Sequence, residues 1–209
     1  MSKMDKDYFL NIAMTMSRSR ANGPGERAVI WVQGCTIGCP GCYNNFTHPH
    51  QLEKIASAKE LANWVGSIEN IEGITFSGGE PFEQSEAISQ VIKIINQNRQ
   101  KPLSVFIFTG FEYDFLKASS NEAVKNLLSL TDMLSAGPYI ASQRNPDLLW
   151  RGSINQELVY LTDCYSSIGE KKWIEESPIE ELIFQNNDIT RTGFLGIKGN
   201  LYQSILNLQ

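Results

Sequence analysis

The sequence lacks several features that would each indicate a class of protein. It has no cluster of Lys or Arg residues, and its formal net charge is −5 over 209 residues. Nucleic-acid binding requires a basic surface, so we expect no nucleic-acid partner. No apolar run approaches the roughly 18 residues of a membrane span, and the charged N-terminus holds no apolar core of a secretory signal. These absences predict a cytoplasmic protein with no membrane partner.

Cysteine is scarce as well, but it is concentrated. Of the four cysteines in the chain, Cys35, Cys39 and Cys42 lie within eight positions, in a loop rich in Gly. In a reducing compartment such spacing favours metal or catalytic use over disulfides. The remaining cysteine, Cys164, is expected to be a lone reduced thiol.

The C-x3-C-x2-C spacing leaves two kinds of metal site open. Thiolates select zinc, copper(I) or iron–sulfur clusters. A structural zinc ion requires four protein ligands, and His48 is near enough in sequence to be the fourth. A cubane cluster held by three cysteines has a different consequence, because one iron then lacks a protein ligand and can bind a substrate or cofactor.

The rest of the chain alternates between strand and helix patterns. Short β-branched and aromatic runs predict strands over residues 28–33, 73–77, 103–111, 131–139 and 157–162. Apolar residues at helical spacing predict helices over residues 57–70, 88–95 and 121–130, the first beginning with a capping box of Ser57 and Glu60. Such alternation predicts an α/β fold with a mostly parallel sheet.

Three polar or glycine-rich elements directly follow predicted strands. They are the cysteine loop, Gly78-Gly79-Glu80 and Thr109-Gly110-Phe111. Ligands of parallel sheets bind beyond the carboxyl ends of the strands, so we expect these elements to meet on one rim. The chain then ends differently, since residues 178–209 contain two extended runs around Asn186-Asn187, which indicate a β-hairpin.

The cysteine spacing after a first strand, followed one strand later by "SGGEPF" (77–82), resembles the radical S-adenosylmethionine (SAM) superfamily. The resemblance implies a partial parallel (β/α) barrel over residues 1–162, with residues 163–209 as a small β-rich C-terminal appendage. It also implies that Cys35, Cys39 and Cys42 hold a 4Fe–4S cluster whose open iron chelates SAM. The cluster and SAM would carry the radical chemistry, and the protein would orient them.

Three further stretches narrow the resemblance. "ANGPGERAVIWVQGC" (21–35), "CPGCYNNFT" (39–47) and "DLLWRGSINQ" (147–156) are similar to the activating proteins of anaerobic (class III) ribonucleotide reductase. The resemblance implies an oxidoreductase that generates a glycyl radical on a partner enzyme, most simply the large subunit of that reductase. A flavodoxin- or ferredoxin-type electron donor and an anaerobic setting are implied with it.

The resemblance also assigns residues to SAM. Gly78 and Gly79 would let backbone groups approach the methionine end of SAM without a Cβ in the way, and Glu80 would accept a charge-assisted hydrogen bond from its ammonium group. The residues expected to contact SAM are Gly41, Cys42, Tyr43, Gly78, Gly79 and Glu80. Further candidates for cofactor contact are Thr109, Arg151, Ser153 and Asn155, for each of which a purely structural role is the alternative.

Two other functions remain open from the sequence alone. One is a radical SAM enzyme that acts on a small molecule, of the deazapurine-synthase type. The other is a non-catalytic module that binds zinc or a cluster and serves protein interaction. Dependence of SAM cleavage on a protein partner, with a glycyl radical on that partner, distinguishes the first. The second is distinguished by reconstitution with iron and sulfide, since the cluster signal of a non-catalytic module would not change when SAM is added.

Overall fold

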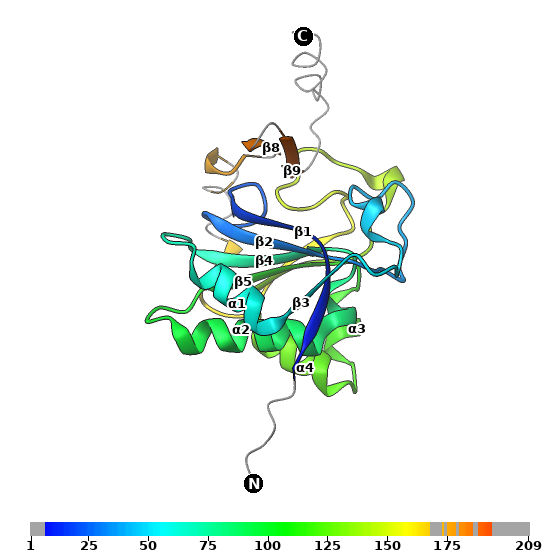
Figure 1. Cartoon of the computed structure of the whole chain (residues 1–209). Helices are drawn as coiled ribbons and strands as arrows, with labels where there is room; N and C mark the ends of the chain where they lie inside the picture. The colour runs from blue at the N-terminus through cyan, green and yellow to red at the C-terminus, as the bar shows by residue number, and fades with distance from the viewer. Residues whose placement is uncertain (1–6, 168–172, 174, 179, 186–187, 194–209) are drawn as a thin grey trace.

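The computed structural model describes residues 7–167, 173, 175–178, 180–185 and 188–193. It is a mixed α/β structure in which the helices cover one face of a central sheet (Figure 1). The strands of this sheet are β1 (Phe9–Ser19), β2 (Arg27–Val32), β3 (Lys54–Ser57), β4 (Gly73–Gly78), β5 (Ser104–Thr109), β6 (Met133–Ala136) and β7 (Glu157–Tyr160). The helices are α1 (Ala58–Gly66), α2 (Ser85–Asn98), α3 (Tyr113–Lys117) and α4 (Glu122–Ser129), with 3-10 turns η1 (Asn45–Thr47), η2 (Pro81–Gln84) and η3 (Ala141–Gln143).

The sheet has the order β3-β1-β2-β4-β5-β6-β7. Its central strands β2, β4, β5 and β6 are parallel, as the alternating pattern predicts. The outer strands β1, β3 and β7 pair antiparallel. The seven described strands form an open sheet with β3 and β7 at its edges, so the expected partial barrel is not confirmed.

Two strands of this sheet are not among the sequence predictions. β1 mixes apolar residues with Asn, Thr, Ser and Arg and has no β-branched run, although it buries Leu10 and Ile12 and pairs with both β2 and β3. β3 has only four residues. Both strands depend on partners distant in sequence, which a local pattern does not reveal.

Helices α1, α2 and α4 form where the sequence predicts them, whereas the short helix α3 is not among the sequence predictions. The capping box at α1 is present, since Ser57 Oγ accepts from the backbone nitrogen of Glu60 at 3.1 Å and the Glu60 carboxylate accepts from that of Ser57 at 2.7 Å. The apolar stripe of α2 is buried against the sheet. No helix in the described part of the chain is long and apolar enough to cross a membrane.

Side chains alternate between the two faces of the central strands. Ile30, Ile74 and Ile107 belong to the main core, in which the apolar stripes of α1 and α2 are also buried. Their strand neighbours Trp31 and Ser77, together with Phe108 and Ser135 of β5 and β6, line a cavity instead. The cavity therefore lies on the face of the sheet that the helices leave open.

A second sheet consists of β8 (Glu180–Gln185) and β9 (Asp188–Gly193). The two strands pair antiparallel from Glu180 and Gly193 to Gln185 and Asp188, which confirms the predicted hairpin, while Asn186-Asn187 and residues 194–209 lie outside the described residues. Figure 1 shows the hairpin on the side of the sheet opposite the helices. The division of the chain after residue 162 stays a prediction.

Candidate functional site

The cysteine loop begins where β2 ends. Gly34 and Cys35 donate backbone hydrogen bonds to the carbonyls of Thr47 and His48, at 2.8 and 3.0 Å, which closes the loop at its base. Gly41 within the loop has a φ of 77°, a left-handed conformation that favours glycine. The loop is thereby folded back on itself, so that its three cysteines come close to the end of the sheet.

All three cysteines of the loop are half-buried and line the cavity, whose volume is about 250 Å³. Burial raises the pKa of the Cys35 and Cys42 thiols, so both are protonated until a metal displaces the protons. His48 lines the same cavity. Among the described residues, no group of three His, Cys, Asp or Glu side chains is arranged to hold a single metal ion.

The three elements that follow strands do meet on one rim. The cysteine loop, the β4–η2 turn and the end of β5 all contribute to the cavity, as do Tyr139 and Gln156 from the loops around β6 and β7. Of the residues expected to contact SAM, the cavity is lined by Cys42, Tyr43, Gly78, Gly79 and Glu80. Gly41 lies beside the cavity, where an added Cβ would stand 3.5 Å from the Tyr139 ring.

Close packing of the protein backbone gives the Gly78-Gly79 pair a role that the sequence does not indicate. An added Cβ on Gly79 would lie 2.0 Å from the carbonyl oxygen of Gly34. The same carbonyl accepts from the backbone nitrogen of Glu80 at 2.8 Å, and Gly79 donates to the carbonyl of Val32 at 2.7 Å. The turn after β4 therefore sits directly on the start of the cysteine loop, and glycine is required for that contact whether or not a ligand is bound.

The Glu80 carboxylate joins the ends of two parallel strands. It is 1% exposed and accepts three hydrogen bonds at 2.9 Å, from the backbone nitrogens of Phe82 and Gly110 and from Thr109 Oγ1. Burial raises its pKa to about 7, against the effect of those three donors. A carboxylate offers about four acceptor positions, so Glu80 retains the capacity for one further donor from the cavity.

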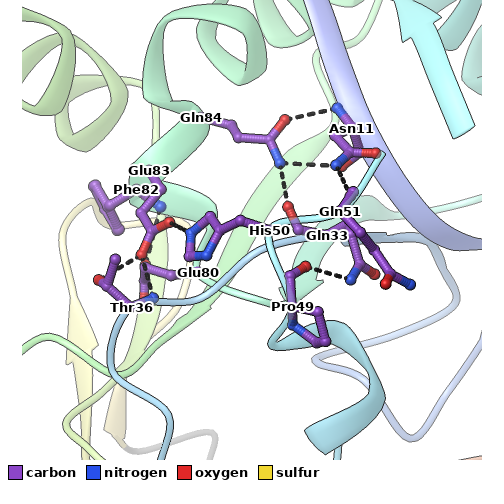
Figure 2. A network of polar contacts seen from close by, with 10 residues as sticks. All are labelled: Asn11, Gln33, Thr36, Pro49, His50, Gln51, Glu80, Phe82, Glu83 and Gln84. Carbon is purple, nitrogen blue, oxygen red and sulfur yellow. Dashed lines mark hydrogen bonds and ion pairs between the residues drawn. The ribbon is translucent and has the colours of Figure 1, made fainter. Parts of the chain in front are cut away.

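A polar network that sequence reasoning missed holds the cysteine loop from outside (Figure 2). Glu83 of η2 accepts from the backbone nitrogen and hydroxyl of Thr36, each at 2.7 Å, and contacts His50 Nε2 at 2.7 Å. Its neighbour Gln84 donates to the carbonyls of Asn11 and Gln33, both at 3.0 Å. A polar pair following Gly-Gly-Glu-Pro-Phe is the only sequence signal for this network, and it is a weak one.

Tyr43 forms part of an aromatic wall of the cavity. Its ring packs edge-on against Tyr139, with the ring centroids 5.4 Å apart, and its hydroxyl accepts from Arg144 Nε at 3.0 Å. An added Cβ on Gly152 would lie 3.0 Å from Tyr43 and 2.9 Å from Tyr139. The segment after Trp150 therefore backs the aromatic pair.

The "WRGSINQ" segment binds the protein's own backbone. Ser153 Oγ accepts from the backbone nitrogen of Ile140 at 3.1 Å, and Asn155 Nδ2 donates to the carbonyl of Pro138 at 2.7 Å. Arg151 Nε donates to the carbonyl of Leu149 at 3.3 Å, and its side chain does not line the cavity. Ser153 and Asn155 therefore hold the loop after β6, as the structural alternative expects, and cofactor contact by the three candidates stays a prediction. Thr109 donates a hydrogen bond to the Glu80 carboxylate and also lines the cavity, so its contact with a cofactor stays a prediction.

Comparison with known proteins shows which family this chain is similar to. A family model described as "4Fe-4S single cluster domain" matches residues 21–159. The chain is 30% identical over 146 residues to the anaerobic ribonucleoside-triphosphate reductase-activating protein of Escherichia coli (strain K12), which covers 67% of this chain and 92% of that protein. It is 33% identical over 147 residues to the protein of the same name from Enterobacteria phage T4, covering 68% of this chain and 88% of that one.

Among solved structures, the crystal structure of QueE from Escherichia coli is similar with a TM-score of 0.37 and 18% identity. The similarity covers 50% of this chain and 53% of that chain. A TM-score this low does not establish a common fold. The matched range 21–159 includes the cysteine loop and the "WRGSINQ" segment, and it ends before the hairpin of β8 and β9.

Proposed function

Since this chain belongs to the family of anaerobic ribonucleoside-triphosphate reductase-activating proteins, we propose that it is a radical SAM oxidoreductase that generates a glycyl radical on such a reductase. We assign the three thiols of Cys35, Cys39 and Cys42 as the ligands of a 4Fe–4S cluster. The observation that carries the proposal is that these thiols and the Glu80 carboxylate line one cavity at the carboxyl ends of the parallel strands.

The residues of the cavity fit the two groups. Three thiols on one short loop are donors of the type that iron–sulfur clusters select. Bound there, the cluster and SAM would supply the electron and the C–S bond cleavage that yield a hydrogen-abstracting radical. Glu80 would accept a hydrogen bond from the SAM ammonium group with its remaining acceptor position, and the half-buried Tyr43 would help to exclude water from the cavity.

The face of the sheet that the helices leave open is the side from which a protein partner would reach the cavity. A protein substrate must reach a cavity at a rim, and in the described part of the chain the helices lie on the other face of the sheet (Figure 1). We propose that the sheet is the core of a partial (β/α) barrel and that a glycine-bearing loop of the reductase enters from its open face. A flavodoxin- or ferredoxin-type donor and an oxygen-free cytoplasmic setting complete the proposal.

The proposal is tested by anaerobic reconstitution with iron and sulfide. Electron paramagnetic resonance of the reduced protein should show a cluster signal that changes when SAM is added, because SAM binds the open iron. An unchanged signal, or four-coordinate zinc in the protein purified without oxygen, would refute the assignment.

The partner is tested in the same samples. With a class III reductase large subunit, a reductant and SAM present, a glycyl-radical signal should appear on the large subunit. SAM cleavage that proceeds at full rate without any protein partner would instead support the small-molecule enzyme and contradict this proposal.

A further inference from the structure

The hairpin of β8 and β9 contributes to the cavity although it lies outside the matched range 21–159. Arg191, Thr192 and Gly193 of β9 line the same cavity as the three cysteines and Glu80. The hairpin covers part of the sheet face that the helices leave open (Figure 1). This chain therefore has a cavity wall for which the family model has no counterpart.

Specific hydrogen bonds attach the hairpin to the end of β1. The Glu181 carboxylate accepts from Ser19 Oγ and from the backbone nitrogens of Arg20 and Ala21, the last two at 2.9 and 3.0 Å. On the other strand, Thr192 Oγ1 accepts from Asn22 Nδ2 at 2.8 Å, and both of these side chains are buried. These contacts place Arg191, next to Thr192, against the cavity in a fixed register.

Arg191 also differs in charge from the rest of the wall. Among the described residues that line the cavity, it is the only Lys or Arg. Glu80 and the three thiols are the acidic groups there, and thiolates bound to a cluster would add negative charge. A cation in the wall of such a cavity favours a ligand that brings a carboxylate, because it offsets the repulsion between like charges.

The guanidinium of Arg191 can serve as this cation while it keeps its partner in the hairpin. Its Nε forms an ion pair with the carboxylate of Glu180. A guanidinium has five N–H donors in a planar fork, so the edge that bears the terminal nitrogens has the geometry for a second carboxylate. The ion pair also holds the side chain in place before a ligand arrives.

We propose that the hairpin of β8 and β9 is an added wall of the cofactor cavity and that Arg191 binds the carboxylate of SAM. This inference rests on the proposed function, because it takes SAM as the occupant. Glu80 and Arg191 then serve the two charged groups of the methionine end, the ammonium and the carboxylate. Arg191 is then a positioning residue that this chain has in addition to the cysteine and glycine motifs of its family.

Binding measurements on the cluster-loaded, full-length protein test the assignment without activity. Isothermal titration calorimetry without oxygen would compare SAM with 5′-methylthioadenosine, which retains the nucleoside and sulfur but lacks the amino-acid end. Arg191→Ala should weaken SAM binding about tenfold, as expected for a lost charge-assisted hydrogen bond. Its affinity for 5′-methylthioadenosine should equal that of the wild type. The affinity of Arg191→Lys for SAM should lie between those of the wild type and Arg191→Ala.

Two further variants separate the contact from a structural effect. Arg18→Ala removes an arginine that pairs with Glu26 away from the cavity, and it should leave both affinities unchanged. Glu181→Gln loosens the attachment of the hairpin while retaining Arg191. It should weaken SAM binding by less than Arg191→Ala and again spare 5′-methylthioadenosine. Circular dichroism of each variant verifies that the fold is retained.

The possible outcomes distinguish this inference from the proposed function. If the wild type binds SAM and Arg191→Ala binds it equally well, the inference is wrong and the proposed function stands. An equal loss of affinity for both ligands would show that Arg191 only maintains the shape of the cavity, which also overturns the inference. If the wild type binds no SAM at all, the proposed function fails first.

Discussion

The carboxylate of Glu83 lies 2.7 Å from both the backbone nitrogen and the hydroxyl of Thr36, the residue that follows the first cysteine of the loop. The same carboxylate also contacts Nε2 of His50, which lies in the segment that follows the loop. Partial burial raises the pKa of Glu83, but the bonds from Thr36 and His50 outweigh this, and the pKa is lowered overall. Glu83 is therefore ionised at neutral pH and joins both ends of the cysteine segment to η2.

Replacing Glu83 should loosen the cluster site without unfolding the protein. In Glu83→Ala the backbone nitrogen and hydroxyl of Thr36 lose their acceptor and form hydrogen bonds with water instead. The loss lowers the local stability of the loop by about 1–3 kcal/mol. The reconstituted cluster should then be lost several-fold faster on exposure to air or a chelator, as followed by its visible absorbance. Glu83→Gln keeps one carbonyl acceptor, so its rate of cluster loss should lie between those of Glu83→Ala and the wild type. Equal cluster lifetimes in Glu83→Ala and wild type would contradict this role.

Gly79→Ala should disrupt the site by steric conflict alone. Its Cβ would stand 2.0 Å from the Gly34 carbonyl oxygen, and both groups belong to the backbone, so neither can rotate away. Overpacking of this kind costs about 1–3 kcal/mol, and the cysteine loop must shift. We expect a lower urea midpoint and a reduced cluster content.

A matched control for Gly79→Ala is available in the same chain. Gly66, at the end of α1, has no atom within 4 Å of an added Cβ, so Gly66→Ala should be neutral or slightly stabilising. If the two variants have the same urea midpoint, the contact between Gly79 and Gly34 does not limit the structure.

Glu80 should make the stability of the protein depend on pH. Burial raises its pKa from 4.5 to about 7, so between these values the folded protein holds a proton that the unfolded chain has released. The contribution is fully present below pH 4.5 and is lost as the pH rises through 7, a change of about 3 kcal/mol. Urea unfolding at pH 5 and pH 8 should show this loss in the wild type and not in Glu80→Gln.

The variant Glu83→Gln provides the comparison for that experiment. Because the pKa of Glu83 is lowered, its titration lies below this pH window, and the variant should keep the wild-type pH dependence. A Glu80→Gln protein that loses as much stability as the wild type between pH 5 and pH 8 would rule out Glu80 as the titrating group.

The cysteines should divide into three that matter for the cluster and one that does not. Cys39→Ala removes a thiol that lines the cavity, and it should abolish both the cluster absorbance and the formation of 5′-deoxyadenosine. Cys164 is exposed and lies outside the cavity, so Cys164→Ala should retain the full iron content. Iron and sulfide analysis measures both. Full 5′-deoxyadenosine formation by Cys39→Ala would remove Cys39 from the ligand set.

The parallel core and the rim could be predicted because their signals are local. The strand runs at β2, β4 and β5 are short and largely apolar, a glycine lies at or close to the end of each, and residues that line the cavity lie at or just after these ends. β1 could not be predicted in this way. It has a mixed composition and is held by pairing with β2 and β3, which the sequence does not encode locally.

Polar residues within a motif are also hard to assign from the sequence. Ser153 and Asn155 have the chemistry of ligand contacts, but the structure uses them to bind the carbonyl and amide groups of the loop after β6. A sequence shows which polar groups exist, but it does not show whether they form hydrogen bonds with a nearby backbone segment. For the same reason, nothing in the sequence indicated that Arg191 would lie in the same cavity as Cys35.

The contact of Gly79 with Gly34 has a consequence for how such a protein can change over time. The thiol loop and the Glu80 turn meet through direct backbone contact, so side-chain replacements elsewhere cannot relieve that contact by small increments. Sequence changes can reshape the outer surface of the protein while this backbone contact is kept. The surfaces that a partner meets can thus change independently, whereas the thiol loop and the Glu80 turn must change together.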